Sequence, residues 1–202
     1  MAPERVRFTR DELQRFSGKT LPDLISHQVR LLFVGINPGL RSVAVQAHFA
    51  PRGNRFYSAL FRAGITDHLI DASSGFAIAD REYLLARGIG ITSLVDRATA
   101  KAEQLTVGEL VQGAERLGNV VREFSPRVVA ILGITAYRKA FNDPHAKLGK
   151  QPAPYQPNPA SELWIVPNPS GRNAHAPLAG LAAAYGEAAR AAGIRAQPRA
   201  HT

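Results

Sequence analysis

Three short polar segments follow apolar runs in this sequence and carry the side chains best suited to chemistry. They are VGINPG (34–39), ITSLVDRAT (91–99) and VPNPSGRNAHAP (166–177). Each begins where a run of Val, Ile or Leu ends, as a loop does after a buried strand. Because the carboxyl ends of parallel strands meet at one edge of a sheet, we expect the three segments to form a common site.

The first and third segments share a design, in which an apolar run ends in Asn-Pro. The amides of Asn37 and Asn168 could orient a water molecule or read the edge of a nucleobase. The neighbouring prolines and glycines stiffen the turn and let the backbone approach a ligand closely. The structural alternative is an Asx turn, in which each amide bonds its own backbone. An Asx turn readily explains either asparagine alone, but it explains less well why two of them follow strands at the same edge of the sheet.

The second segment contributes an acid, Asp96. A carboxylate at the sheet edge could deprotonate a water molecule or stabilise a developing positive charge. Two structural alternatives stay open for Asp96: it could cap the next element, or it could form an ion pair with Arg97.

Arginines rather than acids surround these segments. The stretch 31–66 contains four arginines and no acid or lysine, and the stretch 163–186 contains no acid but carries Arg172 and His175. The whole chain has a formal net charge of +9. This distribution predicts a surface that faces phosphate groups, although a solvated basic face would have the same composition. The four arginines of the first stretch are Arg41, Arg52, Arg55 and Arg62.

Several classes of protein are excluded by the residues that are missing. The chain has no cysteine, so it has no disulfide, thiolate nucleophile or cysteine-bound metal. The six histidines are scattered, and we expect neither a metal nor another cofactor. P-loop, HExxH and GxSxG motifs are absent. No apolar run approaches the roughly 18 residues that a membrane span needs, and the charged start does not resemble a signal peptide.

The periodicity predicts strands alternating with helices. Continuous apolar runs indicate buried strands at 31–35, 89–95, 127–133 and 163–167, and helical spacing indicates helices at 54–64, 80–88, 106–124, 135–141 and 177–192, with a short helix after Thr9. The stretch 142–161 holds five prolines and is expected to be a surface loop. These features predict a single-domain α/β protein, a three-layer sandwich with a mostly parallel central sheet. Its core should span about 28–193, with a frayed tail at 196–202.

The three segments together resemble the mismatch-specific uracil-DNA glycosylases, relatives of thymine-DNA glycosylase. The similarity rests on GINPGLRS and HFAPRGNRFYSAL, followed in family order by TSLVDRAT and NPSGRNAHAPL. It runs from about Leu31 to Ala192, most of the chain, and implies that the chain forms a single uracil-DNA glycosylase-like domain. It also implies hydrolysis of the N-glycosidic bond of uracil, and of thymine or other damaged bases, in mispaired double-stranded DNA. The base is flipped out of the duplex and an abasic site remains.

The resemblance also implies roles for individual residues. Asn37 would position and polarise the attacking water, and Phe49 would stack on the flipped base, although Phe49 could instead be a core residue. Backbone N–H groups near Ile36 and Phe49 could stabilise the departing base. The remaining expected contacts to base and DNA backbone come from Asn168, Ser170, Gly171, Arg172 and Asn173, with further phosphate contacts from Arg41, Arg52 and Arg55.

One position departs from the family pattern. Some relatives carry an apolar wedge directly after the glycine of NPSG, where this chain has Arg172. An arginine can stack on an orphan base and pair with phosphate, so plugging of the duplex is still open to it.

The expected partner is double-stranded DNA rather than a membrane, and the expected protein is a monomer of the bacterial cytoplasm or nucleoid. Two other functions remain open at this point. A nucleic-acid-binding module without catalysis would keep the arginines but need neither Asn37 nor Phe49. A nucleotide or nucleoside hydrolase on the same scaffold would not need the basic surroundings.

Overall fold

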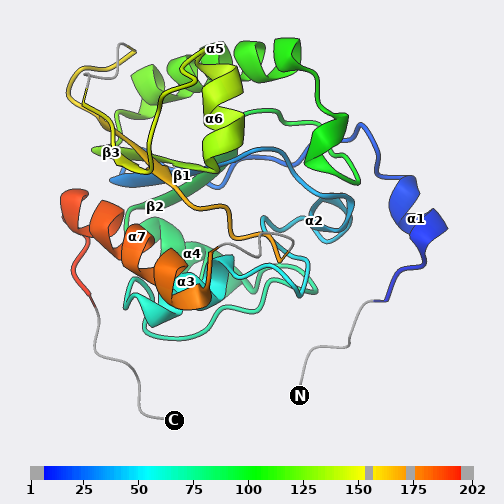
Figure 1. Ribbon diagram of the computed structural model, residues 1–202. Helices are drawn as coiled ribbons and strands as arrows, with labels where there is room; N and C mark the ends of the chain where they lie inside the picture. Colours follow the sequence, from blue (N-terminus) through cyan, green and yellow to red (C-terminus); the bar gives the residue numbers. More distant parts are fainter. Residues whose placement is uncertain (1–6, 153–156, 172–175, 197–202) are drawn as a thin grey trace.

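A five-stranded sheet forms the centre of the part of the chain that the structure describes, residues 7–152, 157–171 and 176–196 of the computed structural model (Figure 1). The sheet has the order β2-β1-β3-β5-β4. Its first four strands run parallel, and the two-residue β4 (Gly149–Lys150) pairs antiparallel with β5 at the edge. The predicted mostly parallel sheet is therefore confirmed. The parallel strands are β2 (Ile89–Ser93), β1 (Leu31–Gly35), β3 (Val128–Leu132) and β5 (Glu162–Val166).

Helices cover both faces of this sheet and give the three predicted layers. Figure 1 shows α5 (Val107–Phe124) and α6 (Ile134–Ala140) above the sheet. Below it lie α3 (Phe56–Arg62), α4 (Ile78–Ala86) and α7 (Leu178–Ala191). None of the described helices is long and apolar enough to cross a lipid bilayer.

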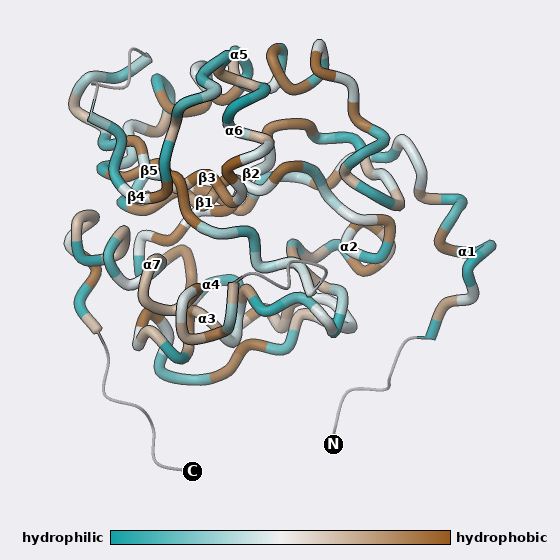
Figure 2. The backbone as a smooth tube through the Cα atoms, in the orientation of Figure 1, coloured by the Kyte–Doolittle hydropathy of each residue, from teal (hydrophilic) through white to brown (hydrophobic). Residues whose placement is uncertain are grey.

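Strand β1 shows why the central strands are apolar throughout. Leu31 and Phe33 belong to the core cluster that includes α3 and α7, whereas Leu32 and Val34 belong to the cluster that includes α5 and α6. Successive side chains of a strand point to opposite faces, so a strand covered on both faces needs an apolar residue at every position. All five residues of β1 are buried, and the hydropathy of the chain in Figure 2 is highest along these central strands.

The structure also holds short elements that the sequence pattern did not predict. These are α2 (Leu40–Ala44), directly after β1, the 3-10 helix η1 (Ala102–Gln104), and β4. The expectation of a loop throughout 142–161 was wrong at Gly149–Lys150, which pairs with Trp164 and Ile165 of β5. A two-residue strand is too short to show an alternating pattern. The tail expected to be frayed lies outside the described residues from position 197 onward.

Helix α5, which the sequence predicted at 106–124, begins at a capping box. The Thr106 hydroxyl accepts from the backbone N–H of Glu109, and the Glu109 carboxylate accepts from the backbone N–H of Thr106. One face of the helix buries Leu110, Leu117 and Val121 against the sheet. On that face the backbone of Gly113 lies so close to the loop after β2 that an added Cβ would be 2.5 Å from the carbonyl oxygen of Leu94.

This contact predicts that Gly113→Ala destabilises the protein. The methyl group would overlap a backbone oxygen that cannot rotate away, and forced overpacking of this kind costs about 1–3 kcal/mol. Gly108→Ala in the first turn of the same helix is the matched control, because its Cβ would meet only the Thr106 hydroxyl, 3.9 Å away. Helix propensity should make that variant neutral or up to about 1 kcal/mol more stable. Urea unfolding followed by circular dichroism measures both changes, and equal stability of the two variants would contradict this packing.

Candidate active site

A cavity of about 1250 Å³ opens at the carboxyl ends of the parallel strands. From β1 the chain passes to β2 on one side, and β3 lies on the other side of β1. The ends of β1 and β3 therefore form the point where strand order reverses, the usual ligand site of such sheets. The lining includes residues at the end of, or after, each parallel strand, among them Gly35, Ile36, Asn37, Phe49, Ser93, Thr99, Gly133, Asn168, Ser170 and Gly171.

Asn37 lines this cavity and its side-chain amide is held by three acceptors. Its Nδ2 donates to the Thr99 hydroxyl at 2.7 Å, to the Arg97 carbonyl at 3.1 Å and to the Pro38 carbonyl at 3.2 Å. Two of the three acceptors are carbonyl oxygens, which can only accept a hydrogen bond. The atom that faces them must therefore be the amide nitrogen.

The hydroxyl of Thr99 strengthens this assignment. It donates its own proton to the carbonyl of Lys101 at 2.8 Å, so its oxygen is left to accept from Asn37. No donor from the described residues reaches the Oδ1 atom of Asn37. The amide is consequently fixed with its nitrogen toward the protein, and its oxygen is the atom available to accept from a water molecule in the cavity.

Phe49 also lines the cavity, and its backbone has φ of +56°. This left-handed conformation is unfavourable for an aromatic residue and persists only when the surrounding structure enforces it. The carbonyl of the preceding residue, His48, accepts from the Tyr57 hydroxyl at 2.9 Å, and the Phe49 ring stacks on Phe56 with 4.1 Å between ring centroids. The ring is half-buried. Phe49 is thus packed against the core and also lines the cavity, so its ring is placed where it could contact a ligand, while the predicted stacking on a base stays a prediction.

Gly35, the last residue of β1, allows the Phe49 ring to reach the strand end. A Cβ at Gly35 would lie 3.3 Å from the Ser93 hydroxyl and 3.5 Å from the Cζ atom of Phe49. The first contact is tighter than a methyl group normally accepts, so a larger residue would displace the hydroxyl or the ring.

Asn168 differs from Asn37, because it forms the Asx turn that was the structural alternative. Its Oδ1 accepts from the backbone N–H of Ser170 at 2.9 Å. The side chain still lines the cavity and packs against Gly133, where a Cβ would lie 3.4 Å from the Asn168 Nδ2. The two asparagines therefore sit at the same cavity, as predicted, but their amides are held in different ways.

The loop after β5 packs directly on the loop that follows Phe49. A Cβ at Gly171 would lie 2.5 Å from the carbonyl oxygen of Gly53, so only glycine fits there. Arg55 joins the same two loops. Its guanidinium donates to the carbonyls of Ser170 at 2.9 Å and Ala176 at 2.6 Å, and its backbone N–H donates to the Pro169 carbonyl at 3.0 Å.

The predicted phosphate-binding arginines thus lie in different environments. Arg55 and Arg41 are half-buried, and Arg41 donates to the Ser73 carbonyl at 2.7 Å and lies over the Phe8 ring. Neither lines the cavity. Arg52 is exposed beside two lining residues, Pro51 and Gly53. Arg172 and Asn173 lie outside the described residues.

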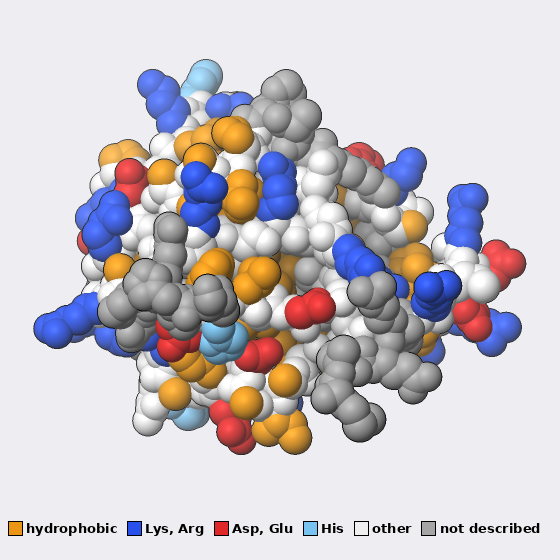
Figure 3. All heavy atoms as spheres, turned by 90° about the horizontal axis from the view of Figure 1, so that it is seen from below, with side chains coloured by type: hydrophobic (Ala, Val, Ile, Leu, Met, Phe, Trp, Pro, Cys, Tyr) orange, Lys and Arg blue, Asp and Glu red, His pale blue; other side chains and the backbone are white. Residues whose placement is uncertain are grey.

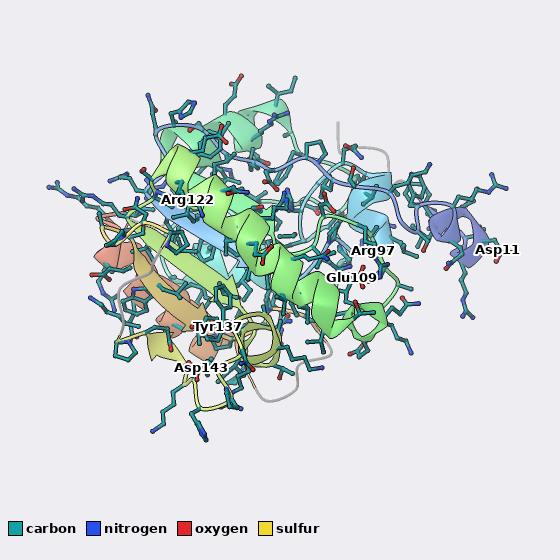
Figure 4. The ribbon with its side chains drawn as sticks, turned by 90° about the horizontal axis from the view of Figure 1, so that it is seen from above. Asp11, Arg97, Glu109, Arg122, Tyr137 and Asp143 are labelled. Atoms are coloured by element: carbon teal, nitrogen blue, oxygen red, sulfur yellow. The ribbon has the colours of Figure 1, made fainter. Side chains whose placement is uncertain are left out.

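The structure does not bring Asp96 to the cavity. Its side chain is exposed and is not among the lining residues. Arg97, the ion-pair partner considered from the sequence, pairs instead with Glu109 of α5, and Figure 4 shows these two side chains facing each other. The hydrogen bond from Arg97 holds the pKa of Glu109 at about 2. Asp96 directly precedes Arg97, whose carbonyl accepts from Asn37, but its own side chain does not line the cavity. The geometry therefore gives no support to the predicted catalytic role of Asp96.

Most described acids that have cationic partners lie away from the cavity. His68 lies between Asp80 at 2.7 Å and Asp67 at 2.6 Å, and hydrogen bonds to these two carboxylates raise its pKa. Figure 3 shows the protein from below, where basic and acidic side chains of the described residues are interspersed and no single-sign patch of them covers the face. Among the described lining residues the only charged side chains are Lys101, Glu103 and Lys139. No described group of three His, Cys, Asp or Glu side chains could hold a metal ion.

Sequence reasoning missed three residues of this site. Thr99 was quoted within the segment TSLVDRAT, but its contact with Asn37 depends on how the loop folds back toward β1. Lys101 and Lys139 follow the ends of β2 and β3 in the chain and line the cavity. Only one feature of the sequence could have pointed to Lys101. It lies five residues after Asp96, the residue that we selected from this loop as a candidate for catalysis.

The fold and site define an α/β protein with a ligand cavity at the carboxyl edge of a parallel sheet. A family model described as "Uracil DNA glycosylase superfamily" matches residues 22–188, and the chain belongs to this superfamily. Membership implies DNA glycosylase activity on uracil, the hydrolysis of a base from its sugar. Among solved structures, the chain is similar to a solution NMR structure from Methanosarcina acetivorans, named a "putative Uracil DNA glycosylase". That match has 14% identity and a TM-score of 0.46, and it covers 77% of this chain and 86% of the other.

The contacts of Arg55 predict a structural rather than a phosphate-binding role. Arg55→Ala should destabilise the protein by about 2 kcal/mol, because hydrogen bonds from a charged donor contribute about 1.5–3 kcal/mol and two carbonyls would lose their partner. Arg52→Ala is the matched control and should leave stability within about 0.5 kcal/mol, since the side chain is exposed. Thermal and urea unfolding measure both. An Arg55→Ala variant as stable as Arg52→Ala would show that the two loops do not depend on this contact.

Proposed function

We propose that this protein removes uracil from mispaired double-stranded DNA by flipping the nucleotide into the cavity, leaving an abasic site. The single observation that carries the proposal is the fixed amide of Asn37, whose nitrogen is held by three acceptors while its oxygen is left to the cavity. A residue that only supported the turn would not need a relay of hydrogen bonds through the Thr99 hydroxyl to the Lys101 carbonyl.

The chemistry expected of an amide is orientation. An asparagine has no basic lone pair with a useful pKa, so it cannot take a proton from the attacking water. Its oxygen can accept a hydrogen bond and hold the water in line with the sugar carbon, which converts an encounter with bulk water into a positioned one. Bond cleavage then places positive character on the sugar and negative charge on the departing base.

Two backbone donors support stabilisation of the departing base. The N–H groups of Ile36 and Phe49 have no acceptor among the described residues, and both residues line the cavity. Preorganised N–H groups of this kind stabilise a developing anion without reorganisation, as an oxyanion hole does. The positive φ of Phe49 is consistent with strain kept to present this N–H and the ring together.

The base would stack on Phe49, and the loop 167–171 would lie against the DNA. Phe49 is backed by Phe56 at 4.1 Å, so the aromatic surface is firmly supported. A base inside a duplex is out of reach, and the cost of flipping it is lower when it is mispaired. This difference supports a preference for mispairs, because a weakly paired uracil loses less free energy when it enters the cavity.

The two rival functions are weakened by the same contacts. A binding module without catalysis would not need the Asn37 amide to be held by three acceptors. A hydrolase of free nucleosides would not need a cavity of about 1250 Å³, which exceeds the usual 300–1000 Å³ of pockets for drug-sized ligands.

The direct experiment uses end-labelled duplexes with a central G·U or A·U pair, a single-stranded uracil oligonucleotide and free deoxyuridine. After incubation with the protein, hot alkali cleaves DNA at abasic sites. We expect cleavage of the G·U duplex to be faster than cleavage of the A·U duplex. Binding without cleavage would support the binding module, and release of uracil only from deoxyuridine would support the nucleoside hydrolase.

The assignment of roles predicts opposite results for Asn37 and Asp96. Asn37→Ala should lower single-turnover cleavage of the G·U duplex by about 10–1000-fold, as expected when a positioning or oxyanion-type contact is lost. Asp96→Asn keeps the shape and removes the charge of an exposed residue outside the cavity, so its rate should stay within about twofold of the wild-type rate.

A large loss in Asp96→Asn would return this carboxylate to the mechanism as a general base, for which about 10²–10⁴-fold is expected. Filter binding of the same duplex serves as the control, because both variants should bind DNA about as tightly as the wild-type protein.

A further inference from the structure

Lysines line the part of the cavity that is bordered by η1 and α6. Lys101 immediately precedes η1, Lys139 lies in α6, and both side chains are exposed. Neither has an ion-pair partner among the described residues, whereas Lys150 at the sheet edge pairs with Glu162 at 2.7 Å. This part of the cavity is otherwise lined mainly by small or apolar residues, such as Ala102, Leu105 and Ile134.

The two lysines supply positive charge to the cavity lining, which Arg41 and Arg55 do not. The guanidinium groups of Arg41 and Arg55 donate to backbone carbonyls within the protein and do not line the cavity. Glu103 is the one acid among the described lining residues, so the three charged side chains together leave an excess of one positive charge.

Both lysines lie on segments that are anchored to the base site. The carbonyl of Lys101 accepts from the Thr99 hydroxyl, which in turn accepts from Asn37. Helix α6 begins after Gly133, whose backbone packs against Asn168 and Ile36. The backbone of each lysine is therefore fixed relative to the place where the base would be hydrolysed.

We propose that Lys101 and Lys139 bind backbone phosphates of the duplex next to the flipped nucleotide, so that the η1 and α6 side of the cavity is a DNA-binding wall. The inference rests on the proposed function, because it takes duplex DNA as the ligand. The size of the cavity fits this assignment, since one base would leave much of the space for the adjoining sugar and phosphate groups. Lysine is a flexible point charge, which suits phosphates whose positions shift as the nucleotide flips.

The test is the salt dependence of binding to an uncleavable duplex that carries a 2′-fluoro deoxyuridine opposite guanine. The double variant Lys101→Ala/Lys139→Ala should lower the slope of log K against log salt by about 2 in magnitude, because each lost phosphate contact changes it by about 1. Affinity at low salt should fall at least tenfold. Glu103→Gln should raise affinity severalfold, since it removes the acid of the same wall.

Lys19→Ala/Arg81→Ala is the matched control. It removes two exposed positive charges that do not line the cavity, so a general loss of net charge acts on both double variants. Lys101→Ala/Lys139→Ala should lower the magnitude of the slope clearly more than the control double variant does. Lys101→Arg/Lys139→Arg should keep the slope of the wild-type protein. Equal slopes for the two double variants would overturn the inference. So would competition by deoxyuridine monophosphate at concentrations comparable to the duplex, since the wall would then bind a free nucleotide.

Failure of the proposed function would be seen in a different measurement. If the wild-type protein binds the duplex but does not cleave G·U, the glycosylase assignment fails while the salt slopes still test the lysines. If it cleaves G·U and the slopes do not differ, only the DNA-binding wall is wrong.

Discussion

The orientation of one amide group is the constraint on which the account of this protein depends. Asn37 directs its Nδ2 to the Thr99 hydroxyl and to two backbone carbonyls, so the oxygen of the same amide is the atom left for a water molecule. If the amide could rotate by 180°, its nitrogen and oxygen would exchange places, and it would offer the water a donor in one orientation and an acceptor in the other. Such an amide could not hold the water in one position. The hydrogen bond from Thr99 to the Lys101 carbonyl removes that freedom, because it fixes which way the hydroxyl accepts.

The fold can be understood as the frame that holds this contact. Strands β1 and β2 pair in register up to Gly35 and Ser93, which brings the two following loops together at the sheet edge. The loop after β5 is held against the loop after Phe49 by the close approach of Gly171 to Gly53 and by the guanidinium of Arg55. In this region Gly171 and Arg55 hold the shape of the cavity, and the positively charged side chains among its described lining residues are lysines.

Much of this arrangement was predictable from the sequence, for identifiable reasons. A strand buried on both faces must be apolar at every position, so β1 and β3 were found at nearly their observed bounds. Asn37 and Phe49 were found through their motif and do line the cavity. The roles of Arg41 and Arg55 were not predictable, because their acceptors are backbone carbonyls, which carry no signature in the sequence.

Asp96 and the two lysines show the other limit of sequence reasoning. A residue just past a strand can turn into the cavity or out to solvent, and the sequence alone does not distinguish the two. Asp96 is exposed and lies outside the cavity, whereas Thr99, three residues later, is buried and contacts Asn37. Lys101 and Lys139 are exposed, so no apolar period marks them, and only the folded structure shows that they line the same cavity as Asn37 and Phe49.

The central claim, that the Asn37 amide is held by Thr99 to orient the water, is tested most directly by comparing Thr99→Val with Thr99→Ser. Valine keeps the shape of the side chain and removes the acceptor, whereas serine keeps the hydroxyl. In single-turnover cleavage of a G·U duplex we predict that valine lowers the rate at least tenfold with DNA binding unchanged, since a small displacement of a positioning group can cost about 10²-fold. Serine should stay within about threefold of the wild-type rate. A wild-type rate in Thr99→Val would contradict the account, because Asn37 would then orient the water without a hydrogen bond to the Thr99 hydroxyl.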